Sequence, residues 1–399
     1  MSATSAAQLR AWRGPVLLSY GFRPFFLFGA LWAALAMVLW IAVFAGALAL
    51  PTRWDPISWH AHELLFGYLA AILAGFLLTA VPNWTGRLPL VGWGLGALVA
   101  TWGLGRLAIA LSDPLPAWLV AAVDLAFPLA LALVILREIV AGKNWRNLVI
   151  LALLAVFLAA NGLFHWEAAR GAFAAQGIGL RLGLATALMM IAVVGGRIVP
   201  SFTRNWLVKA GRQARPSPPM QPFDKVALLV TLAGLLLWVV GPEWRVTGIA
   251  LLLVATLQTV RLLRWKGLQT RSESLLWVLH LGYAFLPLGA LVAGISILAP
   301  EVLGLAAAQH IWMAGAIGLM TLAVMTRATL GHSGQALQAG TGTVLVYLAL
   351  VGSVVARLAA GAWGEVAMEL YGLSALLWIA AFAGFALLYG PLLLRAEHR

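Results

Sequence analysis

Residues 60–81 read HAHELLFGYLAAILAGFLLTAV, and after Glu63 this stretch carries no charged side chain before it stops at Pro82. An apolar helix of about 20 residues crosses the roughly 30 Å of hydrocarbon in a membrane. The stretch therefore predicts a transmembrane helix whose first turn carries His60, His62 and Glu63. Ionisable side chains are expensive inside a membrane and usually face a protein interior or a cavity, so this turn is the first candidate site.

Similar apolar runs recur along the chain, and they decide the fold class. The 399 residues are 63% apolar and 10% charged, with a mean hydropathy of +0.95, whereas soluble domains average about 25% charged residues. This composition excludes an ordinary soluble enzyme, a disordered protein and a nucleic-acid-binding module. We predict an all-α, polytopic membrane protein with about 12 transmembrane helices. They lie near residues 25–50, 60–81, 90–111, 116–137, 147–166, 180–200, 224–241, 246–264, 274–298, 303–326, 341–360 and 367–394.

The positive charge of the chain indicates its orientation. The net charge is +13, and Lys and Arg collect in the cytoplasmic loops of multi-span proteins. With a cytoplasmic N-terminus, 20 of the 26 basic residues fall on that side of the membrane. The other six are Arg53, Arg106, Arg170, Arg181, Arg245 and Arg357. We predict that both termini are cytoplasmic, that residues 1–21 form a cytoplasmic tail, and that residues 22–399 form a single transmembrane domain.

Short sequence matches indicate internal repetition. The second predicted helix ends in VPNWT (residues 81–85) and the sixth ends in VPSFT (residues 199–203). The tenth ends at a matching place, and its His310 precedes a glycine by five residues, as His62 does. These matches predict three four-helix repeats over residues 22–140, 147–265 and 274–394. The alternative is chance similarity within an apolar chain.

Histidine is the main metal ligand that this chain offers. It has no cysteine and 7 histidines, which removes iron–sulfur clusters, thiolate sites and thioether-linked haem. His62 and His310 fall at similar depths in the predicted repeats, so we predict that they face each other as the axial ligands of a haem b. The alternative for each is a single structural hydrogen bond. The full set of candidate metal ligands is His60, His62, His165, His280, His310 and His332.

The first two of these histidines point in different directions on a regular helix. Their side chains are about 200° apart at 100° per residue, so both can be ligands only if they serve different metals or if His60 precedes the helix. Glu63 and Gly67 share the face of His60. That face is explained either by close helix packing or by a metal or proton site that Glu63 supports. Imidazole without thiolate suits copper, iron or zinc.

Arginines recur at the predicted cytoplasmic ends of helices, at Arg23, Arg87, Arg197 and Arg327. Most arginines in such places are anchors at the membrane surface. A guanidinium can also pair with a haem propionate as a fork-shaped donor. Arg197 and Arg327 are therefore candidate cofactor-binding residues.

Several longer motifs resemble one known family. They are GFRPFF (21–26), WHAHE (59–63), GFLLTAVPNWTGR (75–87), HIWMAG (310–315) and MTRATLGHSG (325–334). Together they resemble the NnrS family over nearly the whole chain. The resemblance implies an integral protein of the bacterial inner membrane that contains haem and copper. It also implies a role in nitric oxide metabolism or in resistance to nitrosative stress, with nitric oxide or an iron-nitrosyl species as the partner.

Two kinds of function remain open from the sequence. The first is binding or redox chemistry at a histidine-ligated metal site, with an electron donor protein and with proton uptake through carboxylates such as Glu63 or Asp124. Whether such a site turns over a substrate stays open. The second is a secondary transporter of a metal, haem or a small anion, which repeats and buried charge also fit. Twelve helices in three units look like the catalytic subunit of haem–copper oxidases, although the paired histidines of that copper site are missing here.

Overall fold

The structure is all-helical, as the sequence predicts. The computed structural model describes residues 12–86, 89–301 and 304–395, and no strand occurs in these ranges. Twelve helices within them are long and apolar enough to cross a membrane, which confirms the prediction of an all-α, multi-pass membrane protein. In chain order the spans are α2 (Phe22–Phe44); α3, η2 and α4 (Pro56–His62, Glu63–Tyr68, Leu69–Thr85); α5 (Trp93–Ala110); α6 (Ala117–Ala141); α7 (Leu148–Ala169); α8, η5 and α9 (Ile178–Met190, Ile191–Gly195, Gly196–Lys209); α10 (Pro222–Val240); α11 (Arg245–Leu263); α12 (Ser274–Leu298); α13, η7 and α14 (Leu305–His310, Ile311–Leu319, Met320–His332); α15 (Thr341–Ala362); and α16 (Ala367–Leu394).

Three spans contain a π-helical segment, which the sequence pattern does not reveal. These segments are η2, η5 and η7, and they fall in the second, sixth and tenth spans. The same three spans are the most deeply buried among the described residues, with 78%, 72% and 67% of their most apolar windows buried against 56% or less elsewhere. Each π-helix thus occupies the second position of a predicted four-helix repeat. The repeats and the single transmembrane domain stay predictions.

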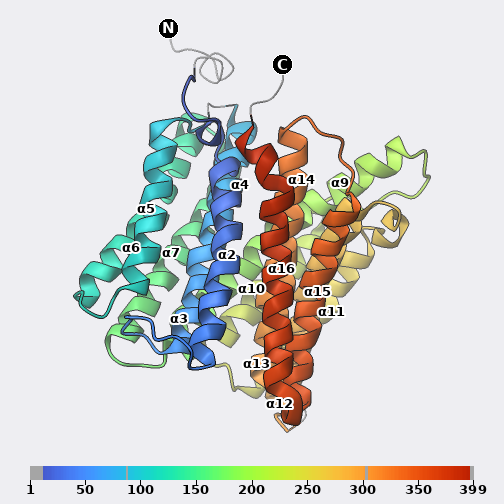
Figure 1. The fold of residues 1–399 in the computed structure, drawn as a ribbon. Coiled ribbons are helices and arrows are strands. Elements are labelled where there is room, and N and C mark those ends of the chain that lie inside the picture. The colour runs from blue at the N-terminus through green and yellow to red at the C-terminus, as the bar shows by residue number, and fades with distance from the viewer. Residues whose placement is uncertain (1–11, 87–88, 302–303, 396–399) are drawn as a thin grey trace. The chain divides into compact units, whose positions relative to one another are not determined.

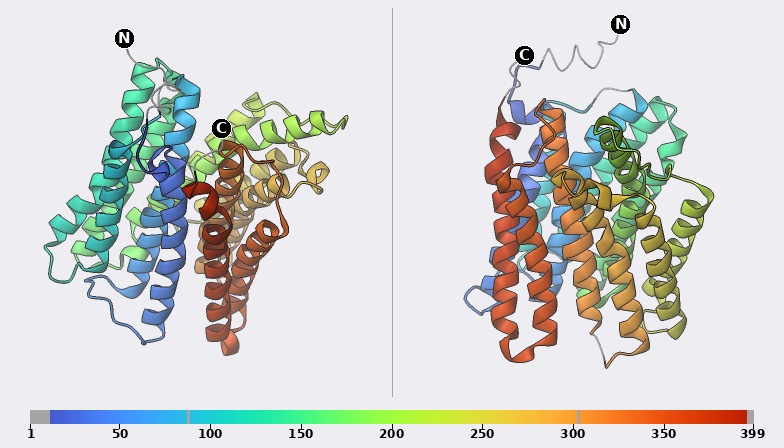
Figure 2. Two further views of the ribbon diagram at one scale, coloured as in Figure 1. Left: turned by 45° about the horizontal axis from the view of Figure 1, so that its top comes forward. Right: turned by 90° about the vertical axis from the view of Figure 1, so that its right-hand side faces the viewer.

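The packing of the helices divides the described chain into two compact units. Unit 1 holds the described residues up to Gly183, together with Ala328–Gln335 and the described residues from Phe382 onward. Within it, α2 packs on α4, α5 packs on α6, and α6 packs on α4 and α7; the blue to teal helices run side by side in Figures 1 and 2. Glycine permits the closest of these approaches, because a Cβ added at Gly75 would lie 2.7 Å from the ring of Phe26.

Unit 2 comprises Leu184–Arg327 and Ala336–Ala381. Here α11 packs on α10 and α12, and η7 packs on α12 and α15. The backbones of α11 and α12 come close together, since a Cβ added at Gly294 would lie 2.9 Å from the carbonyl oxygen of Gly248. Small residues at such crossings are typical of helices that pack within a membrane.

The ends of the helices are fixed by local polar contacts. Asp55 caps α3 by accepting a hydrogen bond from the backbone N–H of Ser58, with Pro56 in the first turn,. Gly86 ends α4 in the left-handed conformation, with φ of 67°,. Arg23 is buried rather than extended to a membrane surface, and its Nη1 donates to the carbonyl oxygens of Leu392, Leu393 and Arg395 at the end of α16.

Candidate metal centre

Unit 1 contains a buried cluster of polar side chains that four spans supply. The second span gives His62 at the end of α3 and Glu63 at the start of η2, and α5 and α6 give Arg106 and Asp124. The fifth span, α7, adds Asn161 and His165. The exposed fraction of each of these six residues is 5% or less. A cluster of ionisable groups this deep in a membrane protein is a candidate functional site.

His62 lies at the centre of the cluster, and both of its ring nitrogens face oxygen atoms. Nδ1 is 3.0 Å from Oε1 of Glu63, and Nε2 is 2.9 Å from Oδ1 of Asn161 and 3.3 Å from Oδ2 of Asp124. A neutral imidazole has a single N–H to donate. Both contacts are therefore satisfied together when the ring carries two protons, and a metal ion would take the place of one of them.

Asp124 is the second centre of the cluster, because four side chains converge on its carboxylate. Besides the contact with His62, its Oδ2 accepts from Nδ2 of Asn161 at 2.8 Å and faces Nε2 of His165 at 3.0 Å. Its Oδ1 accepts from Nη2 of Arg106. Nη1 of the same arginine donates to Oε1 of Glu63 at 2.7 Å, so one guanidinium joins the two carboxylates.

The charges of this cluster do not balance when both histidines are neutral. When both are ionised, the carboxylates of Glu63 and Asp124 carry two negative charges, and Arg106 supplies one positive charge. An unbalanced charge away from water is strongly unfavourable. A proton on a carboxylate or on His62, or a bound cation, would restore the balance.

Two glycines make room for the guanidinium and the carboxylate. A Cβ added at Gly67 would collide with Nη1 of Arg106, and one added at Gly105 would lie 2.9 Å from Oδ1 of Asp124. The π-helix η2 also leaves the carbonyl oxygen of Gly67 in reach of a side chain, and Nε1 of Trp102 donates to it at 2.9 Å. π-Helical turns are frequent at functional sites.

Aromatic rings enclose the two histidines. The ring centroids of His62 and His165 are 5.3 Å apart, and Trp54 packs edge-on against both, at 4.7 and 5.2 Å. Phe164 and Phe66 lie 5.3 and 5.4 Å from His62. This enclosure holds both imidazoles in place.

The donor set of the cluster fits a metal ion. One ligand atom from each of His62, Asp124 and His165 lies within 4.8 Å of the other two. Two imidazoles and a carboxylate suit copper, iron or zinc. Glu63 already contacts the other ring nitrogen of His62, Nδ1, as outer partners of metal-binding histidines commonly do,.

The assignment of His62 as an axial haem ligand is not tested by the described residues. Both of its nitrogens are engaged with side chains of unit 1, and aromatic rings pack around it. His310 belongs to unit 2, so the predicted axial pair of these two residues stays a prediction. His310 itself fits metal ligation, because its Nδ1 bonds to the carbonyl oxygen of Ala306 at 2.7 Å and Nε2 remains as the ligand atom,.

The structure brings two of the six candidate histidines together and places the others elsewhere. His60 stacks on Trp40 with a centroid distance of 4.5 Å, so it points away from His62, as regular helix geometry predicts. His332 at the end of α14 packs against Phe22 in unit 1. His280 is in unit 2, where its Nε2 is 2.8 Å from Oγ1 of Thr203.

The two candidate cofactor-binding arginines both belong to unit 2. Arg327 lies over the ring of Phe202, with 4.3 Å between Cζ and the ring centroid. Arg197 lies in the first turn of α9. Their assignment to a haem propionate stays a prediction, and Arg87 lies outside the described residues.

Unit 2 contains a second buried arginine network. Arg261 of α11 is fully buried, and its Nε donates to Oδ1 of Asp224 at 2.9 Å. Nη1 donates to the carbonyl oxygen of Ala192 in η5 and to the hydroxyl of Tyr283, both at 2.9 Å. That hydroxyl in turn donates to Oε1 of Gln258 at 2.6 Å. An arginine thus braces a π-helical span in this unit too, as Arg106 does in unit 1.

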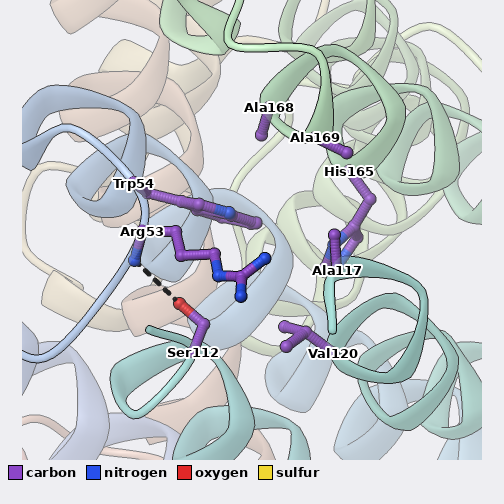
Figure 3. Close-up of a pocket in the computed structure, with 8 residues that line it drawn as sticks. All are labelled: Arg53, Trp54, Ser112, Ala117, Val120, His165, Ala168 and Ala169. Carbon is purple, nitrogen blue, oxygen red and sulfur yellow. Dashed lines mark hydrogen bonds between the residues drawn. The ribbon is translucent and has the colours of Figure 1, made fainter. Parts of the chain in front are cut away.

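A small cavity adjoins the histidine–carboxylate cluster in unit 1. Its volume is about 70 Å³, and His165 forms part of its wall. Figure 3 shows Arg53 and Trp54 on one side of it and His165 with Ala117 on the other. The cluster is therefore deep in unit 1 but has a hollow next to one of its histidines.

Sequence reasoning about metal ligands finds His62 and His165 but misses three of their partners. The sequence pattern indicates Asp124 only for proton uptake and Arg106 only for orientation, and it does not single out Asn161. A signal for the first two is present, because each is a lone charged residue within an apolar run. Asn161 gives no such signal, since an amide is common at helix interfaces.

These features define a polytopic membrane protein with a buried histidine–carboxylate centre. The family model described as NnrS protein matches residues 16–397, and the chain belongs to this family. The resemblance seen in the sequence motifs is thereby confirmed. Membership indicates a role in the response to nitric oxide. Comparison with curated proteins gave no match.

Proposed function

We propose that this protein acts in nitric oxide metabolism or in resistance to nitrosative stress through a metal ion held by His62, Asp124 and His165. The observation that carries this proposal is the convergence of three buried ligand atoms that all lie within 4.8 Å of one another. Family membership supports the link to nitric oxide. Copper is the metal that we propose, because the donors suit it and the family resemblance implies it.

The residues of the chain have separable tasks in this proposal. His62, Asp124 and His165 hold the ion, and Arg106 positions Glu63 and Asp124 by donating to both carboxylates. Asn161 fixes the carboxylate of Asp124 by donating to its Oδ2. A bound copper ion with an open position would supply a binding or redox site for nitric oxide or an iron-nitrosyl species.

We propose haem b as a second cofactor, with His310 as its ligand. The hydrogen bond from His310 to Ala306 supports this, because it fixes the ring with Nε2 available,. The location that we propose is the bacterial inner membrane with both termini in the cytoplasm. Helix ends that carry His62 and His165 would then face the periplasm, where an electron donor protein can reach them.

Metal and haem analysis of the purified protein tests this function. Copper, iron and zinc are measured by mass spectrometry, and haem by its visible spectrum, in wild type and in the single alanine variants of His62, His165 and His310. We expect the first two variants to lose copper but keep haem, and the third to lose haem but keep copper. His60→Ala is the matched control, because this neighbouring histidine stacks on Trp40 instead of joining the cluster.

Two results would contradict the proposal. A wild-type protein without stoichiometric metal, or a His62→Ala variant with full copper content, would exclude a metal centre at this cluster. Transport of a metal, haem or a small anion by vesicles that contain such a metal-free protein would then favour the transporter.

A further inference from the structure

The cavity beside His165 has the features of a small binding site. Its volume of about 70 Å³ is several times the roughly 10–15 Å³ that one water molecule requires. Its apolar wall comes from Ala117, Val120, Ala168 and Ala169, and its polar wall from Arg53, Ser112 and His165, with Trp54 between them. A ligand of a few non-hydrogen atoms fits such a space, and a larger organic molecule does not.

Arg53 is an exposed residue that brings a positive charge to the wall of this cavity. Its backbone N–H donates to Oγ of Ser112 at 3.1 Å, and its Nε donates to the carbonyl oxygen of Asp113 at 3.0 Å. These two bonds fix the backbone of Arg53 and the Nε end of its guanidinium. The described residues offer no acceptor to Nη1 and Nη2, and Figure 3 shows the guanidinium extending into the space between Trp54, His165 and Val120.

The first turn of α6 forms part of the wall of the same cavity. Ala117 and Val120 of its first turn line the wall, and among the described residues no side chain caps this end of the 25-residue helix. The first N–H groups of a helix and its dipole favour an anion. Two independent sources of positive potential thus meet at one small space.

His165 provides the third polar element and links the cavity to the histidine–carboxylate cluster. The residue is 5% exposed, its Nε2 faces Asp124, and its Nδ1 has no hydrogen-bond partner in the described part of the chain. If Nε2 coordinates a metal, a neutral ring carries its proton on Nδ1. Nδ1 then becomes a donor to whatever occupies the cavity.

We propose that this cavity binds a small monovalent oxyanion, of the size of nitrite, between Arg53, the N-terminus of α6 and His165. A single guanidinium and the nearby carboxylate of Asp124 select a monoanion over a dianion. This inference rests on the proposed function in one respect: the anion would lie next to the metal ion that His165 is proposed to bind. Anion and metal should bind cooperatively, because the metal makes His165 a donor and offsets the charge of Asp124.

Calorimetric titration with sodium nitrite tests this inference on the full-length protein in lipid nanodiscs. We expect saturable binding to wild type and an affinity about tenfold or more lower in Arg53→Gln, because a charge-assisted contact is removed. Arg53→Lys should retain part of the affinity. The matched control is Arg170→Gln, which removes an exposed arginine at the end of α7 that packs on Trp166 outside the cavity. Ala168→Leu, which fills the cavity, should abolish binding.

The experiment distinguishes a failure of the anion site from a failure of the metal site. Absence of saturable binding to wild type, or equal affinities in wild type and Arg53→Gln, would overturn it. The metal content of every variant is measured alongside, and Arg53→Gln should retain the wild-type amount. Nitrite binding that depends on Arg53 in a protein without metal supports the inference and contradicts the proposed function. A protein that retains its metal but does not bind nitrite supports the proposed function and contradicts this inference.

Discussion

Removal of one side chain, Arg106, should destabilise this protein more than the removal of any exposed charge. In the variant Arg106→Gln, the two carboxylates of Glu63 and Asp124 lose the guanidinium that joins them, while both remain buried. Each keeps weaker partners, since Glu63 still contacts His62 and Asp124 still contacts His165. The perturbation therefore leaves excess negative charge inside the helix bundle.

The magnitude follows from the burial of these groups and from the ion pairs that the substitution removes. Breaking a buried ion pair by removing one partner costs about 3–5 kcal/mol, because an uncompensated charge stays behind. Arg106 is 4% exposed and serves two carboxylates, so we expect a decrease of about 3–5 kcal/mol in the free energy of unfolding. Neutralising both partners as well should recover much of this decrease, since amides leave no charge behind.

Equilibrium unfolding in mixed micelles with increasing SDS measures this free energy. The matched control is Arg170→Gln at the end of α7, where an exposed guanidinium lies 4.7 Å from the ring centroid of the exposed Trp166. Such an exposed contact contributes no more than about 1 kcal/mol. The rescue is the triple variant that adds Glu63→Gln and Asp124→Asn. A decrease below about 1 kcal/mol in Arg106→Gln, or a triple variant less stable than the single one, would refute the charge argument.

Three further predictions concern packing, hydrogen bonding and the metal. Gly105→Ala places a Cβ 2.9 Å from Oδ1 of Asp124 and should lower the free energy of unfolding by about 1–3 kcal/mol. In the control Gly103→Ala, on the same helix, the added Cβ meets no atom within 4 Å, so stability should be unchanged or rise by up to about 1 kcal/mol. Equal effects of the two substitutions would contradict the crowding at Gly105. Tyr283→Phe removes the hydroxyl that donates to Gln258 at 2.6 Å and should lower the free energy of unfolding by about 1–3 kcal/mol in the same assay. An unchanged free energy of unfolding would show that this buried network is dispensable. Chelation of the bound metal should lower the unfolding temperature of wild type. Copper at about 100 times its dissociation constant should then raise the free energy of unfolding by about 2.7 kcal/mol. No change with copper would contradict binding to the folded state.

The fold is predictable from the sequence because membrane spans are read from local composition. An apolar run of sufficient length, such as residues 274–298, gives the same bounds in the sequence pattern and in the structure. What local composition does not reveal is the π-helical geometry of the second, sixth and tenth spans. An average helical period does not show where one extra residue enters a turn.

The candidate site is predictable only in part, for the same reason. A histidine in an apolar run, such as His62 or His165, signals a buried polar group whatever surrounds it. Its partners are set by packing across distant segments, since Asp124 lies on a different helix and Asn161 is 99 residues from His62. Regular helix geometry also groups Glu63 with His60, whereas in the π-helical turn Glu63 contacts His62 and Arg106.

The charge balance of the two arginine networks distinguishes the cluster of unit 1 from the network of unit 2. In unit 2, Arg261 faces the carboxylate of Asp224 at 2.9 Å, so one positive charge meets one negative charge. In unit 1, Arg106 faces both Glu63 and Asp124, and one negative charge remains. Burial makes that remainder strongly unfavourable unless a proton or a cation neutralises it. The second carboxylate in unit 1 therefore creates the demand for a positive charge that the two neighbouring histidines can hold as a proton or as a metal ion.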